Sequence, residues 1–155
     1  MPQNTIEQTI TINAPADKVY RALTEPSELT RWFATEAKSD TRAGGKYHFT
    51  FTFNDASRNH ETMGDYRAAE PGKRVAYSWP AGHAKVPTEV EFSLAPKGNA
   101  TEIRIVHSGW AATTEESRKE HEMGWGFFLS NLKSYLEDGK DQRPAALGMK
   151  TAAAV

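Results

Sequence analysis

The chain has 155 residues, a formal net charge of −1, 25% charged residues and no cysteine. This length favours one domain with one core, and the missing cysteines exclude disulfides, thiolate metal sites and cysteine nucleophiles. The near-zero charge gives no bulk attraction to nucleic acid or anionic lipid. No apolar run reaches the roughly 18 residues of a membrane span, and residues 1–6 lack the pattern of a signal peptide. We therefore expect a cytoplasmic protein that contacts neither nucleic acid nor membrane.

The first predicted element is a strand over residues 5–12, where isoleucine or glutamine alternates with glutamate or threonine. A short helix is predicted after Pro15, because proline is tolerated in the first turn of a helix. A second short helix is predicted after Pro26, and it presents the large side chains Trp32 and Phe33. The chain thus begins with one strand followed by two short helices.

The apolar period returns to two after Gly44 and Gly45, where residues 46–53 place Tyr47, Phe49 and Phe51 on one face. Further strands are predicted at residues 61–69, 74–79, 88–94 and 102–108, with a weaker one at 35–40. The breaks between them are short and rich in glycine, proline and asparagine, as in turns. Strands joined in this way predict an antiparallel meander.

The last predicted element is a long helix that ends at Gly139. Thr113 and Glu116 have the spacing of a capping box at its start. Its apolar stripe comprises Trp125, Phe128, Leu129, Leu132, Tyr135 and Leu136. We predict an α+β fold in which a curved antiparallel sheet of six to seven strands surrounds this helix. Residues 1–140 would form a single domain, and residues 141–155 would form a disordered tail because they are small and aperiodic.

Three groups of residues resemble a known family. They are the run INAPADKVYRALT at residues 12–24 with Leu29, Trp32 and Phe33; Gly64-Asp65-Tyr66 with Pro71, Val75, Tyr77 and Trp79; and Gly124-Trp125 with Leu129, Leu132 and Leu136. In this order and spacing they resemble the START-like (SRPBCC) superfamily, and within it the group named after the activator of heat-shock protein 90 ATPase. The resemblance covers residues 6–139.

The resemblance implies a helix-grip fold, in which a seven-stranded antiparallel sheet holds the long helix and a cavity lies between them. The same fold hosts lipid carriers, hormone receptors, cyclases and co-chaperone domains, so the fold alone does not give the function. Our first hypothesis is a binding protein for a small hydrophobic or amphipathic molecule in that cavity.

The ligand-binding candidates are the large side chains expected to point between the sheet and the helix. They are Trp32, Phe33, Tyr47, Phe49, Phe51, Tyr66, Tyr77, Trp79, His107, His121, Trp125 and Phe128. Each ring could instead be ordinary core, and the sequence does not decide between a filled and an open interior. The helix-weakening Gly124 would permit a strand or a ligand to approach closely.

Two alternative functions remain. A cyclase- or hydratase-like enzyme would use His107 or His121 as acid and base in the same cavity. A protein-interaction module would use the sheet face or an exposed pair formed by Met123 and Phe127, and the chain would be a monomer or a weak homodimer. No cofactor fingerprint is present, and His60 beside Glu61 lacks a second histidine at zinc spacing, so we expect neither cofactor nor metal.

Overall fold

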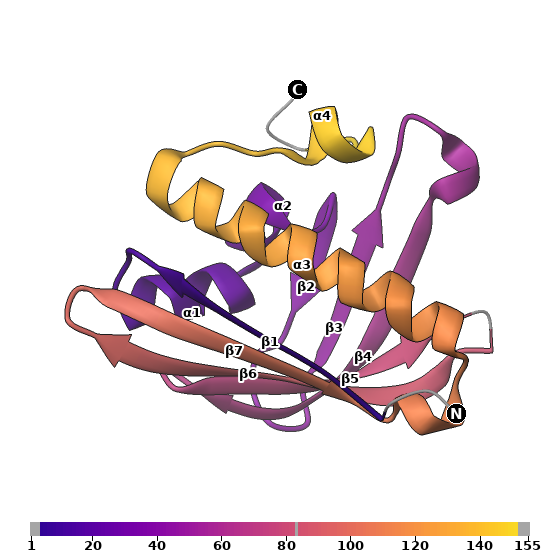
Figure 1. Cartoon of the computed structure of the whole chain (residues 1–155), viewed down its shortest axis with the longest axis horizontal. Helices are drawn as coiled ribbons and strands as arrows, with labels where there is room; N and C mark the ends of the chain where they lie inside the picture. Colours follow the sequence, from indigo (N-terminus) through magenta and orange to yellow (C-terminus); the bar gives the residue numbers. More distant parts are fainter. Residues whose placement is uncertain (1–3, 83, 152–155) are drawn as a thin grey trace.

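A seven-stranded antiparallel sheet curves around one long helix in the computed structural model, which describes residues 4–82 and 84–151 (Figure 1). The strands are β1 (Thr5–Ile12), β2 (Glu36–Ser39), β3 (Lys46–Phe51), β4 (His60–Glu70), β5 (Arg74–Ala81), β6 (Val86–Lys97) and β7 (Ala100–Ser108). The helices are α1 (Ala16–Thr24), α2 (Pro26–Trp32), α3 (Glu115–Asp138) and α4 (Arg143–Leu147), with short 3-10 turns η1 (Ala56–Arg58) and η2 (Trp110–Ala112).

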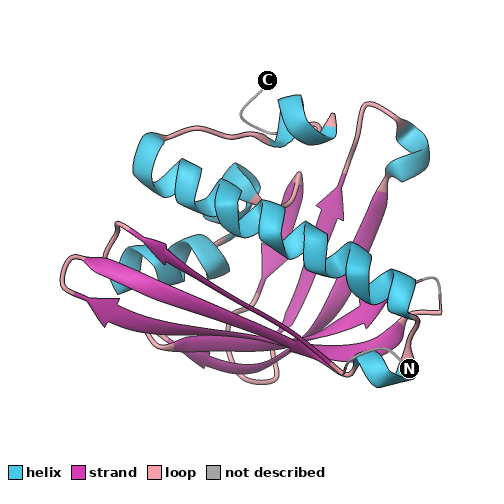
Figure 2. Ribbon diagram, viewed as in Figure 1, coloured by secondary structure: helices cyan, strands magenta, loops and turns pink. Residues whose placement is uncertain are grey.

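The sheet order β1-β7-β6-β5-β4-β3-β2 confirms the predicted meander. Strands β2 to β7 follow one another along the chain, and β1 joins the sheet beside β7 in a continuous register that pairs Ile6 with His107. The long helix α3 crosses the concave face, while α1 and α2 fill one end of the space (Figure 2). The predicted helix-grip fold is therefore confirmed.

Helix α3 spans 24 residues and begins one residue later than the predicted capping box requires. The cap is Thr114, whose hydroxyl accepts a hydrogen bond from the Ser117 amide at 3.1 Å. Thr113 is occupied elsewhere, because its hydroxyl donates to the Trp110 carbonyl oxygen at 2.8 Å and closes the η2 turn. The predicted end is confirmed, since Gly139 takes the left-handed φ of 67° that favours glycine.

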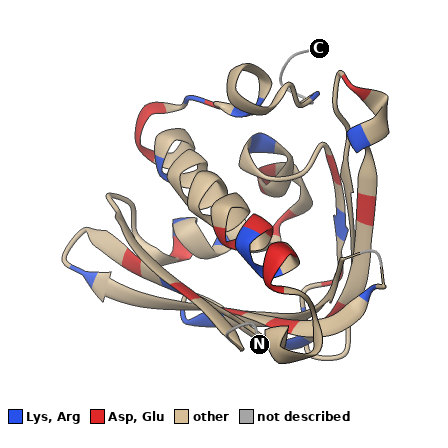
Figure 3. Ribbon diagram, turned by 45° about the vertical axis from the view of Figure 1, so that its right-hand side comes forward, with Lys and Arg blue, Asp and Glu red and all other residues tan. Residues whose placement is uncertain are grey.

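Charged side chains gather at the two ends of α3 and leave its middle uncharged (Figure 3). Trp125, Leu129 and Leu132 on this stretch are buried against the sheet. The aromatic core meets them there: Phe33 stacks on Trp125 with ring centroids 5.8 Å apart and meets Phe51 edge-on at 5.2 Å. Aromatic rings of the core therefore meet beneath the middle of α3.

The segment after α3 is folded over residues 141–151, so the predicted disordered tail is wrong for this part, and residues 152–155 lie outside the described residues. Helix α4 follows Asp141, and Arg143 and Met149 are both buried. Met149 also forms a β-bridge with Phe53, which extends the line of β3. The prediction failed because small, aperiodic residues can be held by a few long-range polar contacts that no local pattern shows.

Strand β4 separates from β5 next to Gly64. Their regular pairing stops at Tyr66 and Tyr77, and the Asp65 amide instead donates to the Ser78 hydroxyl at 2.9 Å. The Tyr47 ring lies over Gly64, and its hydroxyl donates to the Ser78 carbonyl oxygen at 2.6 Å. A glycine is required here, because a Cβ on Gly64 would lie 2.6 Å from the Tyr47 ring and 2.7 Å from the Ser78 carbonyl oxygen.

A Gly64→Ala variant is expected to lose about 1–3 kcal/mol of unfolding free energy, because the added methyl group must displace a backbone carbonyl as well as a ring. Urea denaturation followed by tryptophan fluorescence measures the loss. Gly126→Ala is the control, since a Cβ there meets only the Gln8 amide oxygen at 3.6 Å. An unchanged midpoint for Gly64→Ala would show that Tyr47 can move aside at no cost.

Candidate functional site

A cleft of about 590 Å³ opens between the first half of α3, the outer ends of β3 and β4, and α4. Its floor consists of the buried rings of Phe33, Phe51, Trp79 and Trp125. Its rim is formed by Phe53, Arg58, His60, Glu120, His121, Met123, Gly124, Phe127, Phe128 and Leu147. This volume lies within the range of about 300–1,000 Å³ that small-molecule sites occupy, and an apolar floor with a few polar rim groups is typical of them.

The cleft divides the predicted ligand-binding residues into two groups. Phe33, Phe51, Trp79, His121, Trp125 and Phe128 line it. Trp32, Tyr47, Phe49, Tyr66, Tyr77 and His107 do not, and all of them are buried in the core around it. The inner group supports the floor from behind: the Tyr47 ring stacks at 6.4 Å from Trp79, for example. These six residues are therefore core residues that do not contact the cleft.

His107 is locked in a closed hydrogen-bond network and faces no solvent. The Trp125 indole N–H donates to its Nδ1 at 2.9 Å. The Thr88 hydroxyl donates to the Trp79 carbonyl oxygen at 2.6 Å, so it accepts from Nε2–H of His107 at 2.6 Å. Burial and the neighbouring His121 lower the pKa of His107 to about 3. A neutral histidine with both nitrogens occupied has no proton to exchange with a ligand.

His121 differs from His107 because it lines the cleft. Its Nδ1–H donates to the Ser117 carbonyl oxygen at 2.8 Å, one helical turn earlier. This bond fixes the tautomer, so Nε2 is the acceptor nitrogen, and it has no partner among residues 4–82 and 84–151. Burial lowers the pKa of His121. A neutral ring that can accept a hydrogen bond is thus available to whatever enters the cleft.

Sequence reasoning missed the wall of the cleft opposite α3. His60 stacks on Phe51 with ring centroids 4.9 Å apart, and its Nδ1–H donates to the Arg58 carbonyl oxygen at 2.9 Å. The Arg58 guanidinium lies 4.5 Å from the centre of the Phe53 ring. Leu147 completes this side from the segment predicted to be disordered. Phe53 shares the parity of Phe51 and was the one available signal for this wall.

The sequence predicted Met123 and Phe127 as an exposed pair, and the structure places this pair on the rim of the cleft. Both line the cleft, Met123 being 77% exposed at its mouth. Gly124 lies between them on the rim, and no heavy atom comes within 4 Å of a Cβ placed on it. The sequence suggested that either a strand or a ligand approaches this glycine. No described strand does so, and the glycine borders the open space of the cleft.

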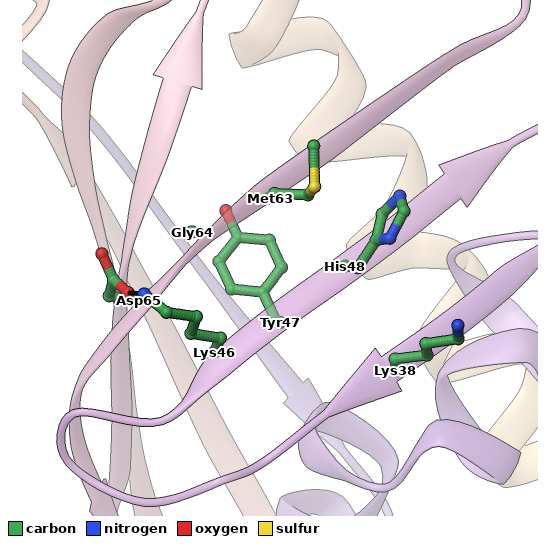
Figure 4. A pocket seen from close by; sticks show the side chains of 7 residues that line it. All are labelled: Lys38, Lys46, Tyr47, His48, Met63, Gly64 and Asp65. Carbon is green, nitrogen blue, oxygen red and sulfur yellow. Dashed lines mark hydrogen bonds and ion pairs between the residues drawn. The ribbon is translucent and has the colours of Figure 1, made fainter.

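A second hollow of about 460 Å³ lies on the face of the sheet away from α3, lined by Lys38, Lys46, Tyr47, His48, Met63, Gly64 and Asp65 (Figure 4). Three of its polar side chains are already engaged: Lys46 pairs with Asp65 at 2.6 Å, and His48 contacts Glu61 at 3.0 Å. The hollow follows from the missing side chain at Gly64 beside the Tyr47 ring. We therefore place the candidate site in the cleft.

No group of three or more histidine, aspartate or glutamate side chains within residues 4–82 and 84–151 could hold a metal ion. Within the same residues, no helix has both the length and the apolar character required to cross a membrane.

Comparison with known proteins gives the chain its relatives. Aha1 from Colwellia psychrerythraea, whose solution structure is a dimer, is 29% identical with a TM-score of 0.74, over 89% of this chain and 99% of that chain. CalU16 from Micromonospora echinospora is 29% identical with a TM-score of 0.68, over 86% of this chain and 74% of that chain.

A curated relative, an uncharacterised protein of Schizosaccharomyces pombe, is 22% identical over 116 residues. The match covers 72% of this chain but only 31% of that protein, so this chain spans about a third of the length of its curated relative. Residues 13–137 match the family described as Activator of Hsp90 ATPase homolog 1-like protein. This match begins just after β1 and takes in α1, α2, strands β2 to β7 and nearly all of α3. The chain therefore belongs to the family of Activator of Hsp90 ATPase homolog 1-like proteins.

Proposed function

We propose that this protein binds a small hydrophobic or amphipathic molecule in the cleft between α3 and the outer ends of β3 and β4. The observation that carries the proposal is the cleft itself, a volume of about 590 Å³ over a floor of four aromatic rings. An apolar molecule resting on Phe33, Phe51, Trp79 and Trp125 would remove aromatic surface from water, which stabilises the complex by roughly 25 cal/mol per Å² before the costs of association.

Gly124 supports the same proposal. A glycine in the middle of a helix costs roughly 1 kcal/mol relative to alanine. The missing side chain of Gly124 leaves open space on the cleft rim, since no described atom lies within 4 Å of the position that a Cβ would take. Keeping the rim open therefore has a cost in stability that the fold itself does not require.

A Gly124→Leu variant tests the proposal without unfolding the protein. The leucine side chain would project into the cleft, so ligand binding should be lost, while helix propensity should raise the unfolding free energy by about 0.5–1 kcal/mol. Binding is measured by two-dimensional NMR titration with a panel of fatty acids and polyphenols. Native mass spectrometry of the freshly purified wild type, before and after organic extraction, searches for a ligand that is already bound.

Gly126→Leu is the matched control, because it places the same side chain on an exposed helix position outside the cleft lining. It should bind like the wild type. Shifts that persist in Gly124→Leu, or a panel that shifts no resonance of the wild type, would contradict the proposal and favour a protein-interaction module.

The enzyme alternative now depends on His121, since His107 is closed off by Trp125 and Thr88. A neutral imidazole on the cleft rim could take a proton from a bound molecule. The same experiment separates the two functions: a ligand recovered with its mass unchanged after prolonged incubation supports binding alone, whereas a reproducibly altered mass supports catalysis.

A further inference from the structure

Arg58 is the one arginine or lysine on the described lining of the cleft, and its charge has no ion-pair partner among residues 4–82 and 84–151. Most other arginines of the described residues are paired, Arg31 being the exception: Arg67 meets Glu89 at 2.8 Å, and Arg104 meets Glu7 at 2.9 Å. The acid nearest to Arg58 in sequence, Asp55, forms no ion pair with it: its carboxylate is engaged by the amide and hydroxyl of Ser57 at 3.1 and 2.7 Å, which lower its pKa more than the charge of Arg58 does. An unpaired guanidinium beside an apolar floor therefore needs an explanation.

The guanidinium of Arg58 is held in place by two contacts. It lies 4.5 Å from the centre of the Phe53 ring, as in a cation–π pair. One of its terminal nitrogens donates to the Leu147 carbonyl oxygen at 2.9 Å, which ties it to the C-terminal segment. A guanidinium carries five N–H donors in a planar fork, so most of them remain available. The group is thus preorganised at the cleft rim before any ligand arrives.

The opposite wall of the cleft carries groups of different chemistry. Glu120 and His121 lie on α3, where the first brings a negative charge and the second a neutral acceptor nitrogen. A negatively charged group in the cleft is therefore attracted towards the Arg58 wall and repelled from the Glu120 wall. This asymmetry gives the site a direction as well as a charge preference.

We propose that Arg58 makes the site selective for apolar molecules that carry a carboxylate, with the carboxylate against its guanidinium and the apolar body on the aromatic floor. The inference rests on the proposed function and adds the ligand class. A carboxylate matches the planar fork of a guanidinium with two parallel hydrogen bonds, which are stronger and more directional than neutral ones.

Matched pairs of probes with nearly the same shape, one a charged carboxylate and one a neutral amide, test the inference. 2-Naphthoate is compared with 2-naphthamide, and decanoate with decanamide, by isothermal titration calorimetry on the full chain. We expect each carboxylate to bind at least tenfold more tightly than its amide. In Arg58→Gln this preference should fall to within about twofold, and in Glu120→Gln the carboxylates alone should bind more tightly. Arg42→Gln removes an exposed arginine that pairs with Asp40, outside the cleft lining, and should behave like the wild type.

The outcomes separate this inference from the proposed function. Equal binding of acid and amide, or a preference that survives in Arg58→Gln, would overturn the role of Arg58 while the cleft remained a binding site. Failure of all four probes to bind would overturn both. Because Arg58 is exposed, its replacement should leave the fold intact, and the amide affinity of Arg58→Gln verifies this independently.

Discussion

An Arg143→Ala variant should lose roughly 3–5 kcal/mol of unfolding free energy, which is a large part of the stability of an ordinary domain. Arg143 is fully buried, and its guanidinium donates four hydrogen bonds. It donates to the carbonyl oxygens of Ala34 at 2.9 Å and Thr30 at 2.7 Å, and it holds Asp141 through two nitrogens at 2.8 and 2.9 Å. Truncation to alanine would leave these oxygens without their partner.

The pair does more than stabilise its own surroundings, because it joins three separate elements. Although burial alone would raise the pKa of Asp141, hydrogen bonds from Arg143 lower it, so the carboxylate is ionised in the folded chain. The buried Asn131 of α3 donates to Asp141 at 3.1 Å and to the Trp32 carbonyl oxygen at 2.9 Å. The C-terminal segment is therefore fastened to both α2 and α3, and Leu147 reaches the cleft as a consequence.

Chemical denaturation of Arg143→Ala, of Arg143→Lys and of a chain ending at residue 140 measures this connection. Lysine keeps the charge but lacks the planar fork of a guanidinium, so it cannot reach all three acceptor residues. The lysine variant should therefore recover only part of the lost stability. If the arginine holds the segment in place, Arg143→Ala and the truncated chain should be destabilised to a similar extent. Arg21→Ala, at an exposed pair, should change stability by no more than about 0.5 kcal/mol. A comparably small effect of Arg143→Ala would contradict the argument.

The order of the elements could be predicted from the sequence because each has a local period. Strand β1 was predicted with its observed bounds, since isoleucine or glutamine alternates with glutamate or threonine along its whole length. The start of α3 was missed by one residue because Thr113 and Thr114 are both capable caps, and only the fold shows that Thr113 is engaged by Trp110. The folded segment 141–151 was missed because Arg143 finds its partners in α2, more than a hundred residues earlier in the chain.

The aromatic character of the candidate site could be predicted from the sequence, but the shape of the cleft could not. Parity and helical spacing correctly place Trp79 and Trp125 between sheet and helix. They cannot tell which rings have empty space beside them, because that depends on where β3 and β4 diverge from α3 in three dimensions. His60 and Arg58 lie where no periodic pattern extends, so their position on the rim emerges only from the fold.

The second large effect should be a loss of stability in mild acid that depends on His107. Burial and the neighbouring His121 lower the pKa of His107 to about 3 in the folded chain, against an ordinary value of 6.5. Between these two values the unfolded chain binds a proton that the folded chain does not. The folded state is therefore fully favoured above about pH 6.5 and loses stability as the pH falls, by roughly 2 kcal/mol between pH 6.5 and 4.5 from this residue.

The hydrogen bonds explain why His107 resists protonation so strongly. Nδ1 is the acceptor for the Trp125 indole N–H, so a proton on Nδ1 would set two donors against each other at 2.9 Å. The ring is also completely inaccessible to solvent, so a charge on it would have no water to stabilise it. Between pH 6.5 and 4.5 the contact between β7 and α3 should therefore stay intact in the folded chain, and acid should act by favouring the unfolded chain, which takes up the proton.

Comparison of the wild type with His107→Asn isolates this effect. The variant will be less stable at every pH because its shorter side chain cannot satisfy both Trp125 and Thr88. The informative quantity is therefore the slope of unfolding free energy against pH, not its absolute value. Between pH 6.5 and 4.5 the wild-type slope should exceed that of the variant by about 1 kcal/mol per pH unit. Nitrogen-15 NMR should show the neutral Nε2–H tautomer of His107 throughout this range. Parallel slopes would mean that His107 does not carry the acid sensitivity. An imidazolium signal from the folded chain at pH 5 would mean that the hydrogen-bond network of His107 opens.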